Sequence, residues 1–310
     1  MSERRLSFVI PARNEAALIG ETLERILASV ASAAGVTRKD LWLPNTSFEV
    51  IVADDGSEDG TAAIVGRLAD DAGVRLVPAV GRTCGSARNT GAVVSSGRVI
   101  CFVDADTIVP ENAVDRILEL HELEGKCLVL YRLASREPGI RAWLWWTFWG
   151  LARSLPLARA KSMPAFMSCD RAHFETYGPF EEAWATAEEW PLTMAAYRHH
   201  RERFLYDRSL TARTSSRRME LRPFGYLRTF LTWVSVVLFR WARTSPIDHV
   251  RHETGNDDAG KKTTESARGA CLLRTVPGIG AAASIREVLD GSDRPPRRRS
   301  FDLSTGSRSL

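Results

Sequence analysis

One short segment constrains the fold of this chain more than any other. Residues 99–103 are Val-Ile-Cys-Phe-Val, and two carboxylates, Asp104 and Asp106, follow one residue apart. A run that is apolar at every position predicts a strand buried on both faces of a sheet. Because a carboxylate is costly to bury, we expect both aspartates just past the carboxyl end of that strand, in the crevice where open α/β sheets bind ligands. Two oxygen donors there suit a hard divalent cation, and such a cation suits a diphosphate; the alternative is a plain surface turn.

Strands and helices alternate in the first half of the 310-residue chain. Other short apolar runs predict strands at residues 6–10, 48–53, 74–77 and 128–131, and apolar residues at helical spacing predict helices at residues 16–32, 61–72, 86–95 and 111–124. The alternation predicts an α/β fold, with a doubly wound, Rossmann-like and mostly parallel sheet between flanking helices. Two of the strands end in acidic pairs, Asp54 with Asp55 and Asp104 with Asp106, so we expect a nucleotide-type ligand with a metal ion.

Composition and charge narrow the classes of function. The five cysteines are scattered without a Cys-x-x-Cys spacing, which predicts a reducing, cytoplasmic location and argues against a zinc site. The net charge of +4 is modest, and a match of residues 276–280 to a DNA-binding hairpin is too short to predict nucleic-acid binding. No apolar run is long enough to predict a membrane-spanning helix.

Four motifs, taken in order, resemble those of a known enzyme family. They are Pro-Ala-Arg-Asn-Glu at residues 11–15, Asp-Asp-Gly-Ser-x-Asp-Gly-Thr at 54–61, Ala-Arg-Asn-x-Gly at 87–91 and Asp-Ala-Asp-Thr at 104–107. Together they resemble family 2 glycosyltransferases of the GT-A fold, of the bacterial type. The resemblance implies a metal-dependent, inverting enzyme of the cell envelope that moves a sugar, as a hexosyl group, from a nucleotide-sugar donor to an acceptor hydroxyl. It also implies Mn²⁺ or Mg²⁺ as cofactor and a glycan, a lipid or a small molecule as acceptor.

The same resemblance assigns roles to individual residues. It places Pro11, Arg13 and Glu15 at the nucleotide end, Asp54 or Asp55 at the base, Arg88 near the base or the phosphates, Asp104 at the ribose and Asp106 on the metal ion. The ion is a Lewis acid that stabilises charge on the leaving diphosphate. Structural roles stay open for two of these motifs, because residues 54–57 also suit a capped strand-to-helix turn and Glu15 also suits the first turn of a helix.

A looser match continues through the second half of the chain, as far as residue 243. Residues 166–182 resemble the acceptor-side segment of the family. Glu188 and Glu189 stand where the family carries a Glu-Asp pair, so the resemblance implies that Glu189 is the general base for the acceptor hydroxyl. The alternative is that Glu189 lies at a helix end and that Glu188 or Glu182 is the base. Residues 214–218, Thr-Ser-Ser-Arg-Arg, resemble a segment of one bacterial subgroup, and no role follows for them.

These patterns divide the chain into a GT-A glycosyltransferase domain at residues 1–243 and a largely disordered basic tail at residues 244–310. Within the domain, residues 1–131 are the predicted nucleotide-sugar-binding half, and residues 132–243 are the acceptor half with C-terminal helices. Residues 143–149 hold four tryptophans, and residues 229–239 are uncharged and largely apolar. Both segments suit either a core or acceptor-pocket helix or peripheral contact with the inner face of the plasma membrane.

Other functions are weighed against this one. A sugar nucleotidyltransferase has a related fold, but residues 11–15 lack its usual glycine-rich loop. A non-catalytic nucleotide-sugar-binding scaffold is favoured by the Glu at position 189 in place of the usual Asp. An aspartyl phosphatase of the haloacid dehalogenase type is disfavoured, because Ile108 stands where that type needs Thr or Val and the motif follows the fourth strand rather than the first.

Overall fold

The computed structural model describes residues 4–81, 83–156, 161, 165–183 and 187–239, and these fall within one compact unit. The predicted tail at residues 244–310 lies outside the described residues. One sheet contains the strands β1 (Leu6–Ala12), β2 (Phe48–Asp54), β3 (Arg75–Pro78), β4 (Val99–Val103), β5 (Thr107–Ile108), β6 (Leu128–Ser135), β7 (Phe166–Asp170) and β8 (Phe204–Thr214). The α-helices of the described residues are α1 (Ile19–Ala34), α2 (Thr61–Ala72), α3 (Cys84–Val94), α4 (Ala113–Leu118), α5 (Ile140–Ser154), α6 (Arg171–Tyr177), α7 (Trp190–His199), α8 (Arg217–Glu220) and α9 (Gly225–Phe239).

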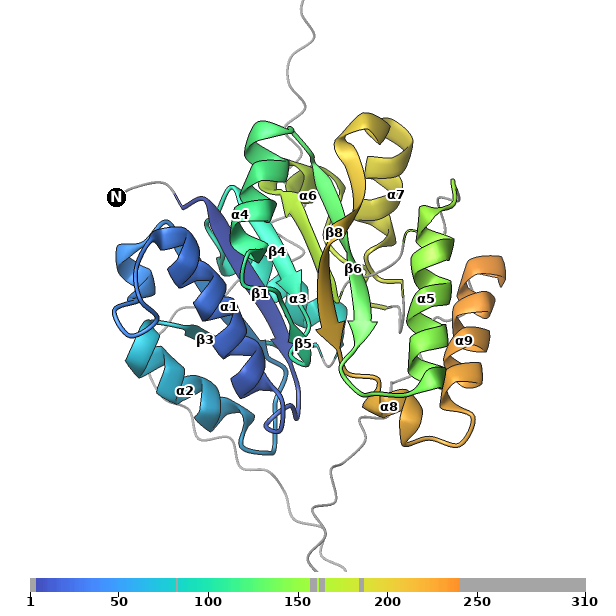
Figure 1. Cartoon of the computed structure of the whole chain (residues 1–310), viewed down its shortest axis with the longest axis horizontal. Helices are drawn as coiled ribbons and strands as arrows, with labels where there is room; N and C mark the ends of the chain where they lie inside the picture. The colour runs from blue at the N-terminus through green and yellow to red at the C-terminus, as the bar shows by residue number, and fades with distance from the viewer. Residues whose placement is uncertain (1–3, 82, 157–160, 162–164, 184–186, 240–310) are drawn as a thin grey trace, which may run out of the picture. The chain divides into compact units, whose positions relative to one another are not determined.

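The sheet has the order β3-β2-β1-β4-β7-β6-β8-β5, and its first four strands are parallel (Figure 1). The predicted α/β fold is therefore confirmed, and all five strands predicted in the first half are present. The sheet is mixed, because β7 runs antiparallel to both β4 and β6, and β5 runs antiparallel to β8. The strand β6 pairs with β7 and β8, so the boundary predicted at residue 131 falls inside β6.

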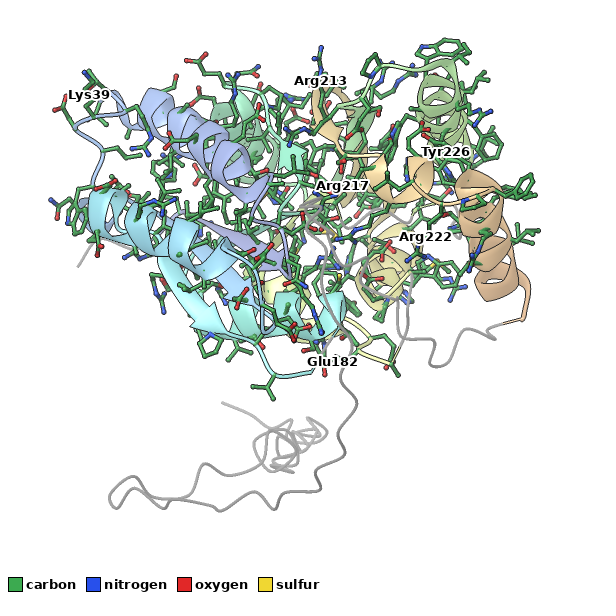
Figure 2. The ribbon with its side chains drawn as sticks, turned by 90° about the horizontal axis from the view of Figure 1, so that it is seen from below. Lys39, Glu182, Arg213, Arg217, Arg222 and Tyr226 are labelled. Carbon is green, nitrogen blue, oxygen red and sulfur yellow. The ribbon has the colours of Figure 1, made fainter. Side chains whose placement is uncertain are left out.

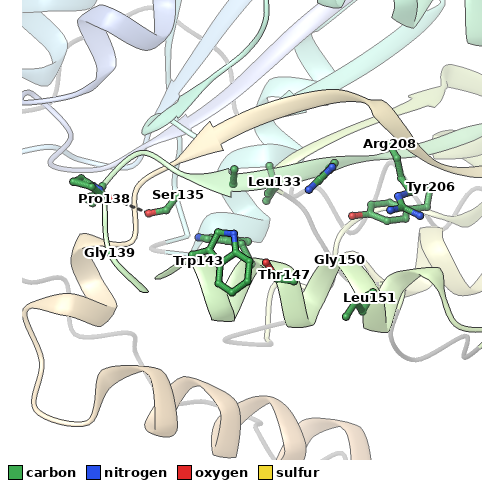
Figure 3. Close-up of a pocket in the computed structure, with 14 residues that line it drawn as sticks. Leu133, Ser135, Pro138, Gly139, Trp143, Thr147, Gly150, Leu151, Tyr206 and Arg208 are labelled. Carbon is green, nitrogen blue, oxygen red and sulfur yellow. Dashed lines mark hydrogen bonds between the residues drawn. The ribbon is translucent and has the colours of Figure 1, made fainter. Parts of the chain in front are cut away.

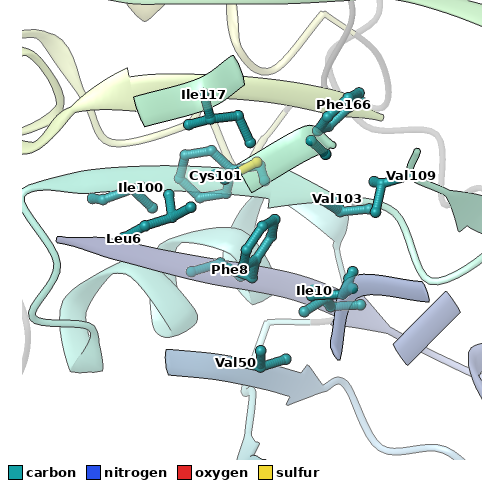
Figure 4. Packing of buried hydrophobic residues seen from close by; sticks show 14 of the residues in the cluster. Leu6, Phe8, Ile10, Val50, Ile100, Cys101, Val103, Val109, Ile117 and Phe166 are labelled. Carbon is teal, nitrogen blue, oxygen red and sulfur yellow. The ribbon is translucent and has the colours of Figure 1, made fainter. Parts of the chain in front are cut away.

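The centre of the sheet is covered on both faces, which explains why its strands are largely apolar. Figure 1 shows α1, α2 and α4 on one face and α3, α6 and α7 on the other. Every residue of β1 and β4 is buried. In Figure 4, Phe8 and Ile10 of β1 pack with Ile100 and Val103 of β4 and with Ile117 of α4. Burial of these side chains supplies the main driving force for this part of the fold.

The helix α3 lies directly on β1, and one glycine makes this approach possible. A Cβ atom added to Gly91 would lie 2.4 Å from Cγ1 of Val9, which is closer than packed atoms allow. The close packing of α3 on β1 therefore explains the glycine at the end of the motif at residues 87–91. Its close approach also brings Arg88, one turn earlier on α3, to the carboxyl edge of the sheet.

The helices α5 and α9 pack against each other through aromatic rings. The ring centroids of Trp149 and Trp233 are 4.5 Å apart, and those of Phe148 and Phe230 are 6.1 Å apart. Figure 1 shows the two helices side by side at one edge of the molecule. In the described part of the chain, no helix has both the length and the apolar character needed to cross a membrane.

Candidate active site

A small pocket lies at the carboxyl edge of β1, β2 and β4, where the sequence predicts a ligand; we call it the edge pocket. The residues that line it are Pro11, Ala12, Arg13, Glu15, Asp55, Thr83, Cys84, Ala87, Asp104, Ala105, Asp106 and Arg218. Six of the eight residues predicted to bind the donor are among them, and Asp54 and Arg88 are not. The topology explains the convergence, because parallel strands bring the residues that follow them to one edge.

Hydrogen bonds join the first two motifs into one loop layer. The hydroxyl of Ser57 donates to Oδ1 of Asp54 (2.5 Å) and accepts the backbone N–H of Asn14 (2.9 Å). The backbone N–H of Glu15 donates to Oγ1 of Thr61 (2.8 Å). Asp54 thus organises the turn, as the structural interpretation of residues 54–57 expects.

Its neighbour Asp55 faces the edge pocket instead. The Asp55 side chain is buried, and its Oδ2 lies 3.5 Å from Nη1 of Arg13. Of the two aspartates between which the sequence could not choose, Asp55 is therefore the one placed to meet a ligand in this pocket.

Arg88 is buried behind the pocket and joins two carboxylates. Its Nη2 lies 2.5 Å from Oδ1 of Asp104, and its Nη1 lies 2.5 Å from Oε1 of Glu188. Its guanidinium group also lies over the ring of Phe180, 5.6 Å from the centroid. Burial lowers the pKa of Arg88, but the two carboxylates outweigh it and leave the pKa above its usual value. Arg88 thus fixes the position of Asp104 rather than lining the pocket.

Asp106 lies in the pocket wall and is nearly buried, with its Oδ1 accepting a hydrogen bond from Oγ1 of Thr214 (3.1 Å). Burial, together with the charges of Asp104 and Glu15, raises its pKa to about 6. Among the described residues no group of three His, Cys, Asp or Glu side chains has the geometry of a metal site. Two carboxylates at one pocket nevertheless fit a hard divalent cation whose other ligands are phosphate oxygens and water, as is usual for Mg²⁺.

Glu15 is held by two arginines from the far end of the domain. Arg217 forms an ion pair with its Oε2, and Nη2 of Arg218 lies 2.6 Å from its Oε1. The resemblance at residues 214–218 had singled out this segment, but no sequence signal connects it with Glu15, which lies more than two hundred residues earlier. Figure 2 shows Arg217 near the middle of the molecule and Arg222 nearer to α9.

The three candidate bases lie outside the edge pocket. Glu182 accepts a hydrogen bond from Nδ2 of Asn89 (2.8 Å), and Glu188 pairs with Arg88 as described. Glu189 has no exposed surface and directly precedes α7. Burial lowers the pKa of Arg153 on α5 to about 10, and the negative charge of Glu189 offsets part of this effect. The structure therefore brings Glu188, rather than Glu189, into contact with the residues around Asp104.

A second, larger cavity lies between α5 and the strands β6 and β8, and we call it the α5 groove (Figure 3). Its volume of about 320 Å³ is within the range of small-molecule sites. Its lining residues are Arg132, Leu133, Ala134, Ser135, Glu137, Pro138, Gly139, Trp143, Trp146, Thr147, Gly150, Leu151, Tyr206 and Arg208. Figure 3 shows Ser135 and Pro138 at one end, and Tyr206 and Arg208 at the other.

The α5 groove is joined to the edge pocket by the segment before α8. Nε1 of Trp146 donates to Oγ of Ser216 (3.0 Å), and the backbone N–H of Ser216 donates to Oε2 of Glu137 (2.6 Å). The hydroxyl of Ser215 donates to the other oxygen of Glu137 (2.6 Å). Because Arg217 follows directly and pairs with Glu15, one short segment contacts both sites.

A pocket at the carboxyl edge of the strands is typical of α/β enzymes that bind nucleotides, and the family comparison agrees with this class of fold. The family model described as glycosyl transferase family 2 matches residues 7–173. The chain belongs to glycosyl transferase family 2. The resemblance inferred from the four motifs is thereby confirmed.

The matches to individual relatives cover only part of this chain and only part of each relative. The probable glycosyltransferase YdaM of Bacillus subtilis is 32% identical over 115 residues, which are 36% of this chain and 24% of YdaM. Among solved structures, TarS of S. aureus has a TM-score of 0.51 at 17% identity, over 78% of this chain and 41% of TarS. Glucosyl-3-phosphoglycerate synthase of Mycobacterium tuberculosis, in complex with Mn²⁺, UDP-glucose and phosphoglyceric acid, has a TM-score of 0.50 at 21% identity, over 76% of this chain and 80% of that one. These two likenesses show the GT-A fold.

Proposed function

We propose that the protein is a metal-dependent, inverting glycosyltransferase that moves a sugar from a nucleotide sugar to an acceptor hydroxyl. The observation that carries the proposal is the edge pocket, where Asp104 and Asp106 meet Arg13 and Asp55 at the carboxyl ends of three parallel strands. This is the place where α/β sheets bind nucleotides. The structure of the Mycobacterium tuberculosis synthase, which has the same fold, was solved with Mn²⁺ and UDP-glucose.

The charges around the edge pocket support a role for a divalent cation. The carboxylates in and against it are Glu15, Asp55, Asp104, Asp106 and Glu188, and the guanidinium groups are Arg13, Arg88, Arg217 and Arg218. With every group ionised, the carboxylates outnumber the guanidinium groups by one. A diphosphate would add more negative charge in a partly buried site, where like charges repel strongly. A cation held by Asp106, with Asp104 beside it, would offset this charge and act as a Lewis acid on the leaving diphosphate.

The remaining roles are those that the family resemblance implies, and the positions of the side chains support them. Asp55, kept in place by Arg13, is positioned to bind the base, and Asp104, kept in place by Arg88, is positioned to bind the ribose. Pro11 lines the pocket and is assigned to its nucleotide end. The acceptor oxygen then attacks the anomeric carbon as the bond to the diphosphate breaks, which inverts the anomeric centre.

We assign the base to Glu189, as the family resemblance implies, and give Glu188 the role of positioning Arg88. Oε1 of Glu188 lies 2.5 Å from Nη1 of Arg88, so this carboxylate holds the guanidinium group that in turn holds Asp104. Glu189 has no exposed surface in this conformation, so an acceptor can reach it only after the neighbouring side chains move.

The α5 groove is the proposed entrance for the acceptor. Its aromatic wall of Trp143 and Trp146 suits the apolar face of a sugar ring or a lipid chain, and Arg132 and Arg208 at its rim suit an anionic group. The groove also reaches the segment that contacts Glu15.

Next to this groove, α5 and α9 expose an apolar surface that suits peripheral contact with a membrane. The stripe on α5 consists of Ile140, Leu144, Phe148 and Leu151 and continues to Leu155 just past the helix, and that on α9 includes Leu227 and Leu231. Neither helix contains a carboxylate, whereas Arg141 and Arg228 are exposed on them. Exposed apolar residues beside cations are typical of helices that lie on an anionic lipid surface.

The test of the proposed function is release of the nucleoside diphosphate. Purified protein is incubated with UDP- and GDP-sugars, with and without Mn²⁺, and the free UDP or GDP is measured. We expect slow, Mn²⁺-dependent release even without acceptor. Release of nucleoside triphosphate from pyrophosphate and a nucleotide sugar would indicate the nucleotidyltransferase instead, and binding without turnover under any condition would indicate the scaffold.

A further inference from the structure

We propose that Arg218 binds the diphosphate of the donor and that Glu15 holds its guanidinium group while the pocket is empty. The proposal rests on the proposed function, since it presumes a nucleotide sugar as ligand. The proposal gives a role to the segment at residues 214–218. Glu15 then binds the guanidinium group of Arg218 until phosphate replaces it, and does not itself contact the nucleotide.

The first observation is how the carboxylate of Glu15 is shared. Each of its oxygens accepts one arginine, and Glu15 itself is only 3% exposed. The two arginines differ, because the side chain of Arg217 is 15% exposed and that of Arg218 is 47% exposed. Arg217 is therefore the enclosed partner, whereas Arg218 has room to change its rotamer.

The second observation is that the edge pocket is too small for its proposed ligand. Its cavity volume is about 50 Å³, whereas sites for small molecules of this kind enclose about 300–1,000 Å³. Of the described residues that line it, eleven precede residue 107 and are fixed by the strands and by α3, and Arg218 alone comes from the C-terminal part. Movement of the Arg218 side chain is the change that would enlarge the cavity with least disturbance of the core.

The third observation is electrostatic. Burial lowers the pKa of Arg218, but the charges of Glu15, Asp106 and Asp104 outweigh it, so the guanidinium group remains charged beside the proposed metal ligands. A diphosphate brought there by a cation would present phosphate oxygens to the same group. Phosphate and carboxylate both accept the paired N–H groups of an arginine, so Arg218 can exchange one for the other without losing its hydrogen bonds.

The backbone at Arg218 is well anchored, so the exchange needs only a side-chain movement. Glu137 accepts hydrogen bonds from the Ser215 hydroxyl and the Ser216 backbone, each at 2.6 Å. Hydrogen bonds from these donors, with a contribution from Ser135, overcome the effect of burial and keep the pKa of Glu137 low. The carboxylate of Glu137 therefore stays charged and continues to hold residues 215 and 216. Arg217 remains on Glu15 after Arg218 leaves, so the buried carboxylate keeps a cation.

The experiment measures the affinity for UDP in the presence of Mn²⁺ by calorimetry, with GDP as a second probe. Arg218→Gln should weaken binding of the diphosphate about tenfold to a hundredfold, as expected for loss of hydrogen bonds between charged groups. Binding of uridine, followed by NMR titration, should change less than twofold, because the nucleoside has no phosphate. Arg218→Lys should fall between the wild type and Arg218→Gln, because it keeps the charge but not the paired N–H groups.

The matched control is Arg213→Gln, which removes an exposed arginine from the end of β8, outside both cavities. It should bind UDP like the wild type. Glu15→Gln should tighten UDP binding at least threefold, because Arg218 no longer has to leave a carboxylate.

Two outcomes would overturn this proposal and leave the proposed function standing. They are wild-type affinity for UDP in Arg218→Gln, or weaker UDP binding in Glu15→Gln, which would make Glu15 a ligand contact. If the wild type binds neither UDP nor GDP with Mn²⁺, the proposed function fails, and this proposal fails with it.

Discussion

Asp106 combines a carboxylate with a nearly buried position, so its protonation links the site to the stability of the fold. Its pKa is raised to about 6, first by burial and then by Asp104 and Glu15, whereas an unfolded chain has a pKa near its ordinary value of about 3.9. The metal-free folded state therefore binds the proton more tightly than the unfolded state. The resulting stabilisation is complete below about pH 4 and is lost as the pH rises through 6.

From this follows a prediction for Asp106→Asn. Without metal, the variant should be more stable than the wild type at pH 7.5, by up to about 3 kcal/mol, and the two should converge near pH 4. Denaturant unfolding of both proteins across this pH range measures the difference. The variant should also lose Mn²⁺-dependent UDP binding, which in the wild type should weaken below pH 6 because a metal ligand must be deprotonated. Equal stability at every pH, or metal-dependent binding in the variant, would contradict the role assigned to Asp106.

The pair Glu188 and Glu189 gives a second prediction at the residue scale. Glu189→Gln should slow transfer by about 10²–10⁴-fold while leaving the affinity for the donor nearly unchanged, because a base touches the acceptor and not the nucleotide. Glu188→Gln should mainly lower the melting temperature and weaken donor binding, because Arg88 and hence Asp104 lose a buried partner. Steady-state kinetics with thermal unfolding separate the two. Full turnover in Glu189→Gln with a severe kinetic loss in Glu188→Gln would transfer the role of base to Glu188.

At the scale of single elements, the approach of α3 to β1 decides where Arg88 and Asp104 stand. Gly91→Ala places a methyl group against Val9 and should destabilise the fold by about 1–3 kcal/mol, as overpacking does. The control is Gly66→Ala in α2, where an added Cβ atom meets no atom within 4 Å; it should raise stability by about 0.5–1 kcal/mol, because alanine favours a helix. Chemical denaturation measures both. A Gly91→Ala variant as stable as the wild type would mean that α3 can shift outward freely.

The strands that the sequence predicted differ from those that it missed in how continuous their apolar residues are. β1, β2 and β4 are buried on both faces, so each contains a run of at least four apolar residues, at positions 8–12, 50–53 and 99–103, that is visible without a structure. β7 contains a serine, Ser168, which is buried because it bonds with His121 (2.7 Å) and Tyr131 (2.7 Å). Its strand character depends on those distant partners, and a pattern of hydrophobicity cannot show them.

The same distinction holds for the candidate site. The six predicted residues of the edge pocket lie at the ends of strands or in the loops that follow them, and topology brings them together. Arg217 and Arg218 reach Glu15 only through the fold of the whole domain, so their spacing in the sequence carries no signal. Likewise, the contact of Arg88 with Glu188, rather than with the pocket, depends on how α3 meets the segment before α7.

At the scale of the whole molecule, the apolar surface of α5 and α9 predicts binding to membranes. The protein should co-sediment with vesicles that contain anionic phosphatidylglycerol, less with neutral phosphatidylcholine, and less again in high salt. Leu144→Glu, in the exposed stripe of α5, should reduce the bound fraction severalfold, and Leu123→Glu should not, because Leu123 is exposed elsewhere, next to α4. A wild-type protein that stays in the supernatant at low salt but forms a dimer would indicate that a second copy covers this surface.

The antiparallel strand between β4 and β6 has a consequence for how the chain is made. Residues 166–170 occupy the middle of the sheet, yet a ribosome reaches them roughly 3–13 s after it completes β4, at typical rates of synthesis. During that interval the nascent chain holds β1 to β4 with one edge unpaired, and β6, already synthesised, has no strand between it and β4. Exposed edges of this kind invite pairing with other chains. Fragments that end near residue 131 should therefore aggregate, whereas those that extend past β7 should remain dispersed, because the edge of β4 is then occupied from within the same chain.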